Sequence, residues 1–257
     1  MSLVLTERHG DVLKIILNKP ERLNAATPVM FEDISAALAK LDGARSVLFM
    51  GAANAFCSGA DLSMLGTAED AGEVAYDALT RSYNPALFAI ASLDVPVVSA
   101  VRGPAAGIGC SLALAADFCM ASETGYFLQA FVKIGLVPDG GASWILPRLI
   151  GKARAAKMMM LGDRISAEEA LEWGLVSRVV GDDMLDGEAL AFAAELAERP
   201  ALAARTLRGR LRSSHLKEYE IALAREANDQ RLAAKTSDAA EGVRAFFDKR
   251  TPIFEGR

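Results

Sequence analysis

The chain has few of the residues that build disulfides, histidine-centred sites and metal centres. Its 257 residues include three cysteines and two histidines. Cys57, Cys110 and Cys119 are an odd number without metal-ligand spacing, which is typical of small buried thiols in a reducing compartment. His9 and His215 lie far from the motifs described below, so a Ser-His-Asp triad, a cysteine nucleophile and a histidine-built metal site are all disfavoured. We expect no metal.

Excess positive charge and long apolar runs are also missing. The net charge of −5 makes no case for a nucleic-acid surface, although a local basic patch for phosphates in the tail remains open. No uncharged run reaches the length of a membrane span, and no positive-then-apolar segment precedes the first expected strand. We therefore expect a cytoplasmic protein without a signal peptide that binds neither nucleic acid nor membrane.

What the chain does have is apolar residues in the patterns of an α/β protein. Hydrophobic residues make up 52% of it, enough for one large domain or a core with a smaller appendage. Strands are expected at 3–7, 11–17 and 47–50, with a helix between the last two that starts at Thr27-Pro28 and runs to about Leu41. This order implies parallel pairing through a crossover helix.

Later elements are expected at less regular intervals. Residues 63–72 are expected to be mobile, and 74–93 to be helical with a break near Pro85. Strands are expected at 118–121, 126–127 and 175–180, and helices at 140–146, 153–160 and 167–172, the last capped by Ser166. From Met184 onward every pattern is helical, so we place a boundary near 195–200, giving regions 1–197 and 198–257.

Two small-residue turns follow apolar strands. One is FCSGADL at 56–62, and the other is GPAAGIG at 103–109, which opens a small-residue helical run. Glycines allow close approach, and the first amides of a helix have no intrahelical partner and attract negative charge. A dinucleotide fingerprint needs a third glycine where Leu112 stands, so that interpretation is disfavoured. A packing turn without a ligand remains open for either turn alone.

Together these turns resemble the signature segments of the enoyl-CoA hydratase/isomerase (crotonase) superfamily. The likeness extends from NKPERLN at 18–24 through GPAAGIGCSLALAAD at 103–117 to FFDKRTP at 246–252. It implies an α/β fold with a crotonase-like ββα spiral core and a C-terminal all-helical oligomerisation region. In the family the two turns donate two backbone N–H groups to the thioester oxygen of an acyl-CoA, and the matching positions are Ala60 and Ile108. Many members have glycine at the second position, but an amide donor needs no particular side chain.

The proton carrier is less clear from the residues. Hydratases of the family use two glutamates, and Ser111 and Phe131 occupy the matching positions, so two-carboxylate hydration is disfavoured. The next acid is Asp139, which precedes Gly-Gly-Ala-Ser-Trp and also suits an N-cap for helix 140–146. Apolar neighbours would raise the pKa of Asp139 and the helix terminus would lower it. On the residues alone, cap and catalyst both remain open.

A closer resemblance favours the catalytic role. KIGLVPDGGASWILPRLIGKARA at 133–155 is similar to the branch containing the ring-1,2-epoxyphenylacetyl-CoA isomerase, in which the matching aspartate is the acid/base. The resemblance implies an isomerase with Asp139 as proton shuttle. An enoyl-CoA hydratase of fatty or aromatic acid breakdown and a non-catalytic acyl-CoA-binding homologue remain alternatives. The dehalogenase branch is disfavoured, because no histidine lies between His9 and His215 and no tryptophan lies in the stretch before Asp139.

The resemblance also implies how coenzyme A, as part of the substrate, is held. No separate cofactor is expected. Adenine and phosphates would border Arg22 and Leu23, and the pantetheine would pass residues 60–63. The full set of expected contacts is Arg22, Leu23, Ala60, Asp61, Leu62, Ser63, Ile108, Lys249 and Arg250. Lys249 or Arg250 would reach a phosphate from a neighbouring subunit of a trimer or hexamer. We expect Asp61 to act as a local cap rather than in the chemistry.

Overall fold

The computed structural model describes residues 2–64, 70–213 and 215–257. Within them the main sheet has six strands in the order β1-β2-β3-β4-β6-β9. β1 is antiparallel to β2, and every other neighbouring pair is parallel. The strands are β1 (Val4–His9), β2 (Val12–Leu17), β3 (Ser46–Gly51), β4 (Val97–Val101), β6 (Phe118–Ser122) and β9 (Arg178–Val180). The expected parallel pairing of 11–17 with 47–50 is confirmed.

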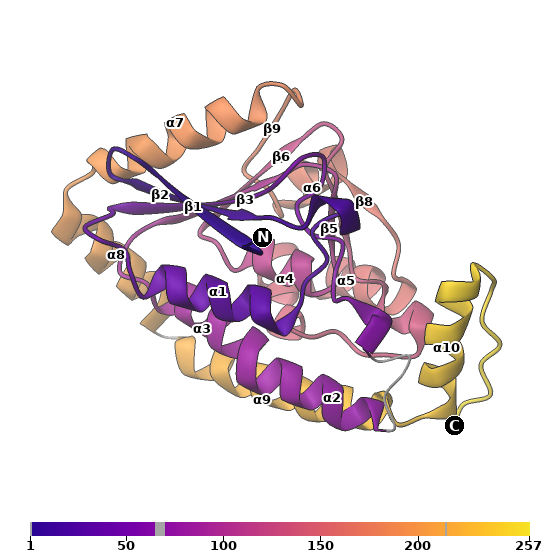
Figure 1. Ribbon diagram of the computed structural model, residues 1–257. Coiled ribbons are helices and arrows are strands. Elements are labelled where there is room, and N and C mark those ends of the chain that lie inside the picture. Colours follow the sequence, from indigo (N-terminus) through magenta and orange to yellow (C-terminus); the bar gives the residue numbers. More distant parts are fainter. Residues whose placement is uncertain (1, 65–69, 214) are drawn as a thin grey trace.

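The central strands β3 and β4 are mostly apolar and almost entirely buried because helices cover both faces of the sheet. On β3, Val47 and Phe49 belong to the larger core cluster, and Leu48 and Met50 to a second cluster with α7. Figure 1 shows α7 on one side of the sheet and α1, α3 and α4 on the other. These helices are α1 (Pro28–Leu38), α3 (Asn84–Ser92), α4 (Ile108–Leu114) and α7 (Leu185–Glu198).

Two helix starts read from the sequence are confirmed. The Thr27 hydroxyl accepts a hydrogen bond from the amide of Met30, and Pro28 fills the first helical position of α1, where no N–H is needed. Ser166 forms a capping box with Glu169 at the start of α6 (Ala167–Trp173). The helix expected to reach Leu41 ends earlier, at Leu38.

The segment expected as a broken helix at 74–93 is three elements. These are α2 (Ala71–Ala78), the π-helical turn η3 (Leu79–Tyr83) and α3. The break therefore precedes Pro85, which lies in the first turn of α3, where a missing N–H is tolerated. Of the stretch 63–72 expected to be mobile, residues 63 and 64 belong to η2 (Leu62–Met64), Asp70 caps α2 and residues 71 and 72 begin it. Residues 65–69 lie outside the described residues.

A second, three-stranded sheet was not expected as such. It joins β5 (Pro104–Ala106), β7 (Tyr126–Leu128) and β8 (Ile165–Ser166). The separate helices expected at 140–146 and 153–160 are found as the two parts of α5 (Ala142–Leu161), which a non-helical kink at Gly151 divides (φ 76°, ψ 160°). Glycine adopts that backbone conformation without a Cβ clash, so the chain bends there and resumes the helix.

Three helices follow α7. They are α8 (Ala201–Ser213), α9 (Leu216–Ala233) and α10 (Ser237–Asp248). Figure 1 shows α9 beside α2, and α9 contributes Tyr219, Leu223 and Ala227 to the main core. α10 packs on η4 (Ala130–Ile134). The expected boundary between 197 and 198 falls at the end of α7.

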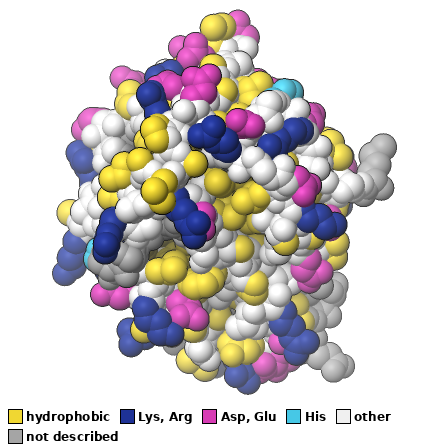
Figure 2. All heavy atoms as spheres, turned by 90° about the vertical axis from the view of Figure 1, so that its left-hand side faces the viewer, with side chains coloured by type: hydrophobic (Ala, Val, Ile, Leu, Met, Phe, Trp, Pro, Cys, Tyr) yellow, Lys and Arg dark blue, Asp and Glu magenta, His cyan; other side chains and the backbone are white. Residues whose placement is uncertain are grey.

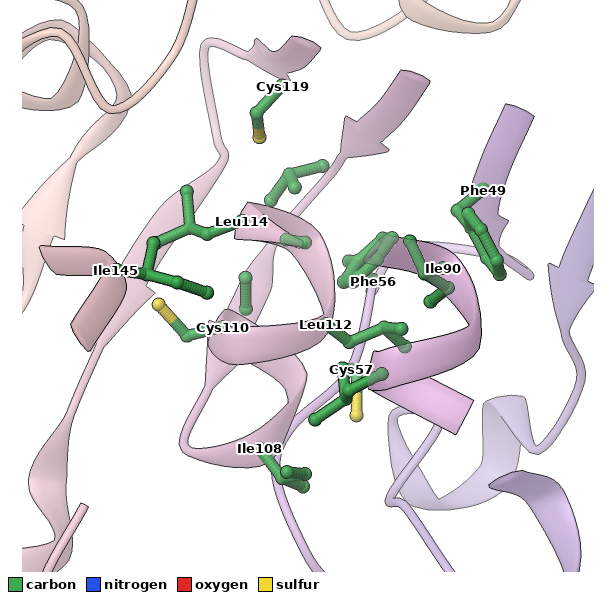
Figure 3. Close-up of a cluster of buried hydrophobic side chains, with 14 of the residues drawn as sticks. Phe49, Phe56, Cys57, Ile90, Ile108, Cys110, Leu112, Leu114, Cys119 and Ile145 are labelled. Atoms are coloured by element: carbon green, nitrogen blue, oxygen red, sulfur yellow. The ribbon is translucent and has the colours of Figure 1, made fainter. Parts of the chain in front are cut away.

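The surface is mixed in character, whereas the interior around α4 is apolar. Figure 2 shows charged side chains of both signs interspersed with hydrophobic ones on one face. Figure 3 shows Cys57, Cys110 and Cys119 among apolar side chains around α4. Burial raises the pKa of Cys57 to about 11 and of the other two to about 12, so the expected buried thiols are confirmed.

Across the described ranges, no helix has the length and hydropathy of a membrane span.

Candidate active site

One cavity gathers most of the expected site residues. It has a volume of about 600 Å³ and lies between the turns at 58–62 and 106–107, α2, η4 and the helices α9 and α10. Six expected residues line it: Arg22, Leu23, Ala60, Asp61, Leu62 and Asp139. The expected residues Ser63, Ile108, Lys249 and Arg250 are not part of its wall.

The two small-residue turns, 56–62 and 103–109, are hydrogen-bonded directly to each other. The amide of Cys57 donates to the Pro104 carbonyl at 2.8 Å, and the amide of Ala106 donates to the Cys57 carbonyl at 2.9 Å. Only small residues permit this approach. Gly59 has φ +101°, and a Cβ on it would lie 3.2 Å from the carbonyl oxygen of Ala106. Segments 56–62 and 103–109 thus form one continuous wall.

The two amides expected to meet a ligand oxygen, those of Ala60 and Ile108, belong to these segments, and of the two residues only Ala60 lines the cavity. Ile108 is the first residue of α4, and Ala60 is the next residue after Gly59. Neither amide donates a hydrogen bond within the described part of the chain. Gly107, the residue before Ile108, lines the cavity beside Ala60. Free amides at the start of a helix suit an oxygen that carries negative charge.

The NKPERLN turn is docked against the same wall. Asn24, fully buried, accepts from the Lys19 amide at 2.8 Å and donates to the carbonyls of Ala52 and Ala55. The carbonyl of Leu23 accepts from the amide of Ser58 at 3.0 Å. These bonds hold η1 (Pro20–Arg22) and the half-exposed Leu23 at the rim of the cavity.

Asp61 is a fixed anion. Its carboxylate accepts from the Lys19 ammonium at 2.9 Å and from the Ser63 amide at 3.2 Å. The hydrogen bond from Lys19 lowers the pKa of Asp61 to about 2. The bond to the Ser63 amide is the local capping contact expected from the sequence. A carboxylate held in this way does not exchange protons near neutral pH.

Asp139 has the opposite environment. Its side chain is buried, with the residue 4% exposed, and Oδ2 accepts from the Gln230 amide at 3.3 Å. Oδ1 has no hydrogen-bond partner among the described residues. Desolvation raises the pKa of Asp139 well above its usual range, the charge of Glu226 raises it further, and the bond from Gln230 opposes both. This carboxyl group is suited to holding and releasing a proton.

The alternative of Asp139 as an N-cap is wrong. α5 begins at Ala142, its N-cap position is Gly141, and no side chain from that position caps it. The amides of Gly141 and Ser143 donate instead to the carboxylate of Glu226, at 2.5 and 2.8 Å. Glycines at 140 and 141 with positive φ turn the chain between Asp139 and the helix, so the aspartate side chain is directed away from the helix amides.

The positions of the two absent glutamates have new occupants. The Ser111 hydroxyl donates to the backbone carbonyl of Asp139 at 2.8 Å, so this residue supports the loop that carries the aspartate. Phe131 lines the cavity, and a Cβ on Gly107 would lie 3.2 Å from its ring. Neither side chain transfers protons to carbon at neutral pH.

Within a single chain, Lys249 and Arg250 do not line the cavity. Arg250 is paired with Glu241 and Asp248, and Lys249 ends α10 in the left-handed region. Phe246 and Phe247 of the same helix line the cavity. A phosphate contact from Lys249 or Arg250 of a neighbouring subunit stays a prediction.

Comparison with known proteins agrees with these features. The family model described as enoyl-CoA hydratase/isomerase matches residues 7–257. The chain belongs to the enoyl-CoA hydratase/isomerase family. It is 37% identical to the 1,2-epoxyphenylacetyl-CoA isomerase of Escherichia coli K12 over the whole of both chains. It is 34% identical to the 2,3-dehydroadipyl-CoA hydratase of the same strain, again over both whole chains.

The crotonase-like fold is also confirmed. The crystal structure of an enoyl-CoA hydratase from Mycobacterium avium subsp. paratuberculosis K-10 superposes with a TM-score of 0.89, is 35% identical, and covers 99% of each chain. Membership of the enoyl-CoA hydratase/isomerase family makes this protein an enzyme of acyl-CoA metabolism. Isomerases and hydratases both occur among the similar proteins.

Two residues of the site were missed from the sequence. Glu226 and Gln230 lie four residues apart on α9 and are both 4% exposed. They share the buried face of α9 with Tyr219, Leu223 and Ala227. Polar side chains at core-facing positions of an amphipathic helix were the available signal.

Proposed function

We propose that this protein is an acyl-CoA isomerase in which Asp139 moves a proton between two carbon atoms of the acyl group. The observation that carries the proposal is the contrast between the two cavity carboxyl groups. Asp61 is tied to Lys19 with its pKa lowered, whereas Asp139 is buried with its pKa raised and Oδ1 unpartnered. A general acid/base works best when its pKa lies near the operating pH.

The chemistry needs one carboxylate and two amide donors. Asp139 takes a proton from a carbon conjugated with the thioester, and the electron pair of that C–H bond moves into the acyl system, with charge on the thioester oxygen. The amides of Ala60 and Ile108 would stabilise that charge, an effect worth roughly 3 kcal/mol or more for a pair of donors. Return of the same proton to another carbon shifts the double bond and restores the carboxylate.

The remaining features of the proposal concern the rest of the substrate and the assembly. Coenzyme A would enter past Arg22 and Leu23 and run along residues 60–63, with Lys249 or Arg250 adding a phosphate contact across subunits of a trimer or hexamer. No separate cofactor is required, and we assign the enzyme to the cytoplasm. Phe131, Phe246 and Phe247 on the cavity wall favour an apolar acyl group.

The test is incubation with a panel of enoyl-CoA and ring-epoxide CoA thioesters, followed by mass and ultraviolet spectra. We expect a product of unchanged mass from at least one of them. A mass gain of one water would assign hydratase activity instead. A raised melting temperature with no conversion of any thioester would indicate a non-catalytic acyl-CoA-binding protein.

A further inference from the structure

Resting on the proposed function, we propose that Glu226 and Gln230 of α9 are positioning residues for the carboxyl group of Asp139. Gln230 holds Oδ2, Glu226 places a fixed negative charge nearby, and Oδ1 is left as the oxygen that carries the proton. The proposal adds to the site a second acid and an amide from the C-terminal helices, which act through Asp139 and not on the substrate.

Gln230 is held at both ends of its amide group. Its Oε1 accepts from the backbone amide of Val137 at 3.1 Å, and its Nε2 donates to Oδ2 of Asp139 at 3.3 Å. The bond to Val137 fixes which end of the Gln230 amide faces the aspartate, because only the oxygen accepts from a backbone N–H. The carboxyl group of Asp139 is therefore anchored through one oxygen, and the other is unpartnered within the described chain.

Glu226 is held still more firmly. It accepts from the amides of Gly141 and Ser143 and from the hydroxyl of Ser143. Burial raises the pKa of Glu226 and the charge of Asp229 adds to the rise, whereas these three donors at the start of α5 oppose it by favouring the ionised form. A carboxylate bound to a helix start through several bonds is a charge with a fixed position.

The charged and titratable groups around Asp139 are few. Glu226 and Tyr219 face it from α9, where the Tyr219 hydroxyl donates to the Gly140 carbonyl at 3.3 Å. Tyr83 of η3 and Asp61 lie on the same cavity wall, and burial raises the pKa of Tyr83. Arg22 and Lys133 also line the cavity, with Lys133 paired to Asp163 at 3.4 Å. Glu226 is the charged group that raises the pKa of Asp139.

This arrangement explains why a helix cap is supplied from 85 residues away instead of by Asp139 itself. An aspartate that capped α5 would have its pKa lowered by the helix amides. Because Glu226 takes those amides, Asp139 is free of them and gains a like charge as a neighbour. The Glu226 carboxylate thus binds the helix start, and the Asp139 carboxyl group is left to exchange protons.

The decisive measurement is the titration of Asp139 in the ligand-free protein. Infrared difference spectra of each variant with and without Asp139→Asn report the protonation of this one carboxyl group across pH. In Glu226→Gln we expect Asp139 to lose its proton at lower pH than in the parent. Gln230→Glu places a second carboxylate beside Oδ2 of Asp139, and this carboxylate can still accept from the Val137 amide. In this variant we expect Asp139 to lose its proton at higher pH than in the parent. Glu220→Gln changes an exposed acid on the same helix and is the matched control, with no expected change.

A purely structural role predicts another pattern. If Glu226 and Gln230 only support the fold, both variants lower the melting temperature and leave the titration of Asp139 where it was, which overturns the proposal. Should Glu226→Gln fail to fold for want of the α5 cap, the nearly isosteric Gln230→Glu decides alone. An unshifted titration there also overturns the proposal.

Turnover separates this proposal from the proposed function. With an acyl-CoA that the parent converts, the rise of kcat/KM with pH should move to lower pH in Glu226→Gln and to higher pH in Gln230→Glu. If no acyl-CoA is converted, the isomerase assignment fails, but the titrations in the ligand-free protein still confirm or overturn the positioning roles.

Discussion

One half of the cavity wall is built from backbone groups and the other half from side chains. The N-terminal half, residues 58–62, 106 and 107 of the two turns, presents backbone between small residues. The C-terminal half, the 135–141 loop with α9 and α10, presents side chains: Asp139, Gln230, Phe246 and Phe247. Backbone donors tolerate changes of side chain but not of backbone spacing, whereas the other half depends on the identity of each residue. The predictions below test that contrast.

The largest expected effect belongs to the side-chain half. Asp139→Asn should lower turnover by on the order of 100- to 10,000-fold, because it removes the general base. The melting temperature should stay near that of the parent, since Asp139 caps no helix. Steady-state kinetics and thermal unfolding measure the two. Asp61→Asn, at the other cavity acid, should lose far less turnover. A folded Asp139→Asn protein with near-full activity would contradict the assignment.

The next effect belongs to the backbone half. A Cβ on Gly109 would lie 2.6 Å from the Cβ of Cys57, so Gly109→Ala must push the two turns apart. We expect a loss of about 1–3 kcal/mol in the free energy of unfolding, measured by denaturant titration. Gly187→Ala in α7 is the control, because no atom lies within 4 Å of its added Cβ. That helical substitution should be neutral or stabilising. Equal effects at the two glycines would show that the turns are not closely packed.

A smaller effect is expected from changing the side chain of Ile108, the residue whose backbone amide is one of the two expected donors. Ile108→Val shortens a fully buried side chain and should cost about 0.5–1.5 kcal/mol of stability. Turnover should remain within a few-fold of the parent, because the amide of residue 108 is unchanged. Kinetics and denaturant unfolding of the same preparation compare the two quantities. A hundredfold loss of turnover with normal stability would mean that the Ile108 side chain, and not its amide, acts on the substrate.

The smallest expected effect concerns the ion pair at the rim. Lys19 lowers the pKa of Asp61 to about 2 from an ordinary value of 3.8. Stability from this pair is therefore present above about pH 4 and is lost as the pH falls toward 2. Lys19→Met should remove roughly 1 kcal/mol or less at pH 7 and less than that at pH 2, where Asp61 is about half protonated. Unfolding curves at both pH values measure the difference. A loss that is the same at pH 2 would assign the effect to packing of the lysine stem.

Much of the fold is readable from the sequence because it depends on local patterns. The parallel strands follow from apolar runs, and the helix starts at Thr27-Pro28 and Ser166 follow from capping chemistry within four residues. The short strands β5 and β8 have two or three residues each and no pattern of their own, so only the folded neighbours define them. The division of α5 at Gly151 agrees with the two separate helices expected from the sequence, because glycine readily adopts the non-helical backbone conformation found there.

The site divides in the same way. Both glycine-rich turns and the buried acid at 139 were identified from motifs, and six of the expected residues line one cavity. The N-cap alternative for Asp139 failed because the competing cap comes from Glu226, far along the chain. Local spacing carries no information about a partner on another helix. Side chains of α9 therefore entered the site only through the structure.

The cap from Glu226 also bears on how the chain folds. A helix start that depends on a group 85 residues later closes a long loop, and such contacts form late because their entropy cost is met only when the ends are already near each other. During synthesis, the first turn of α5 and the loop bearing Asp139 remain without this partner until α9 has been made. A nascent chain that ends before residue 216 contains segments 56–62 and 103–109 and Asp139, but it lacks the Glu226 carboxylate that binds the start of α5.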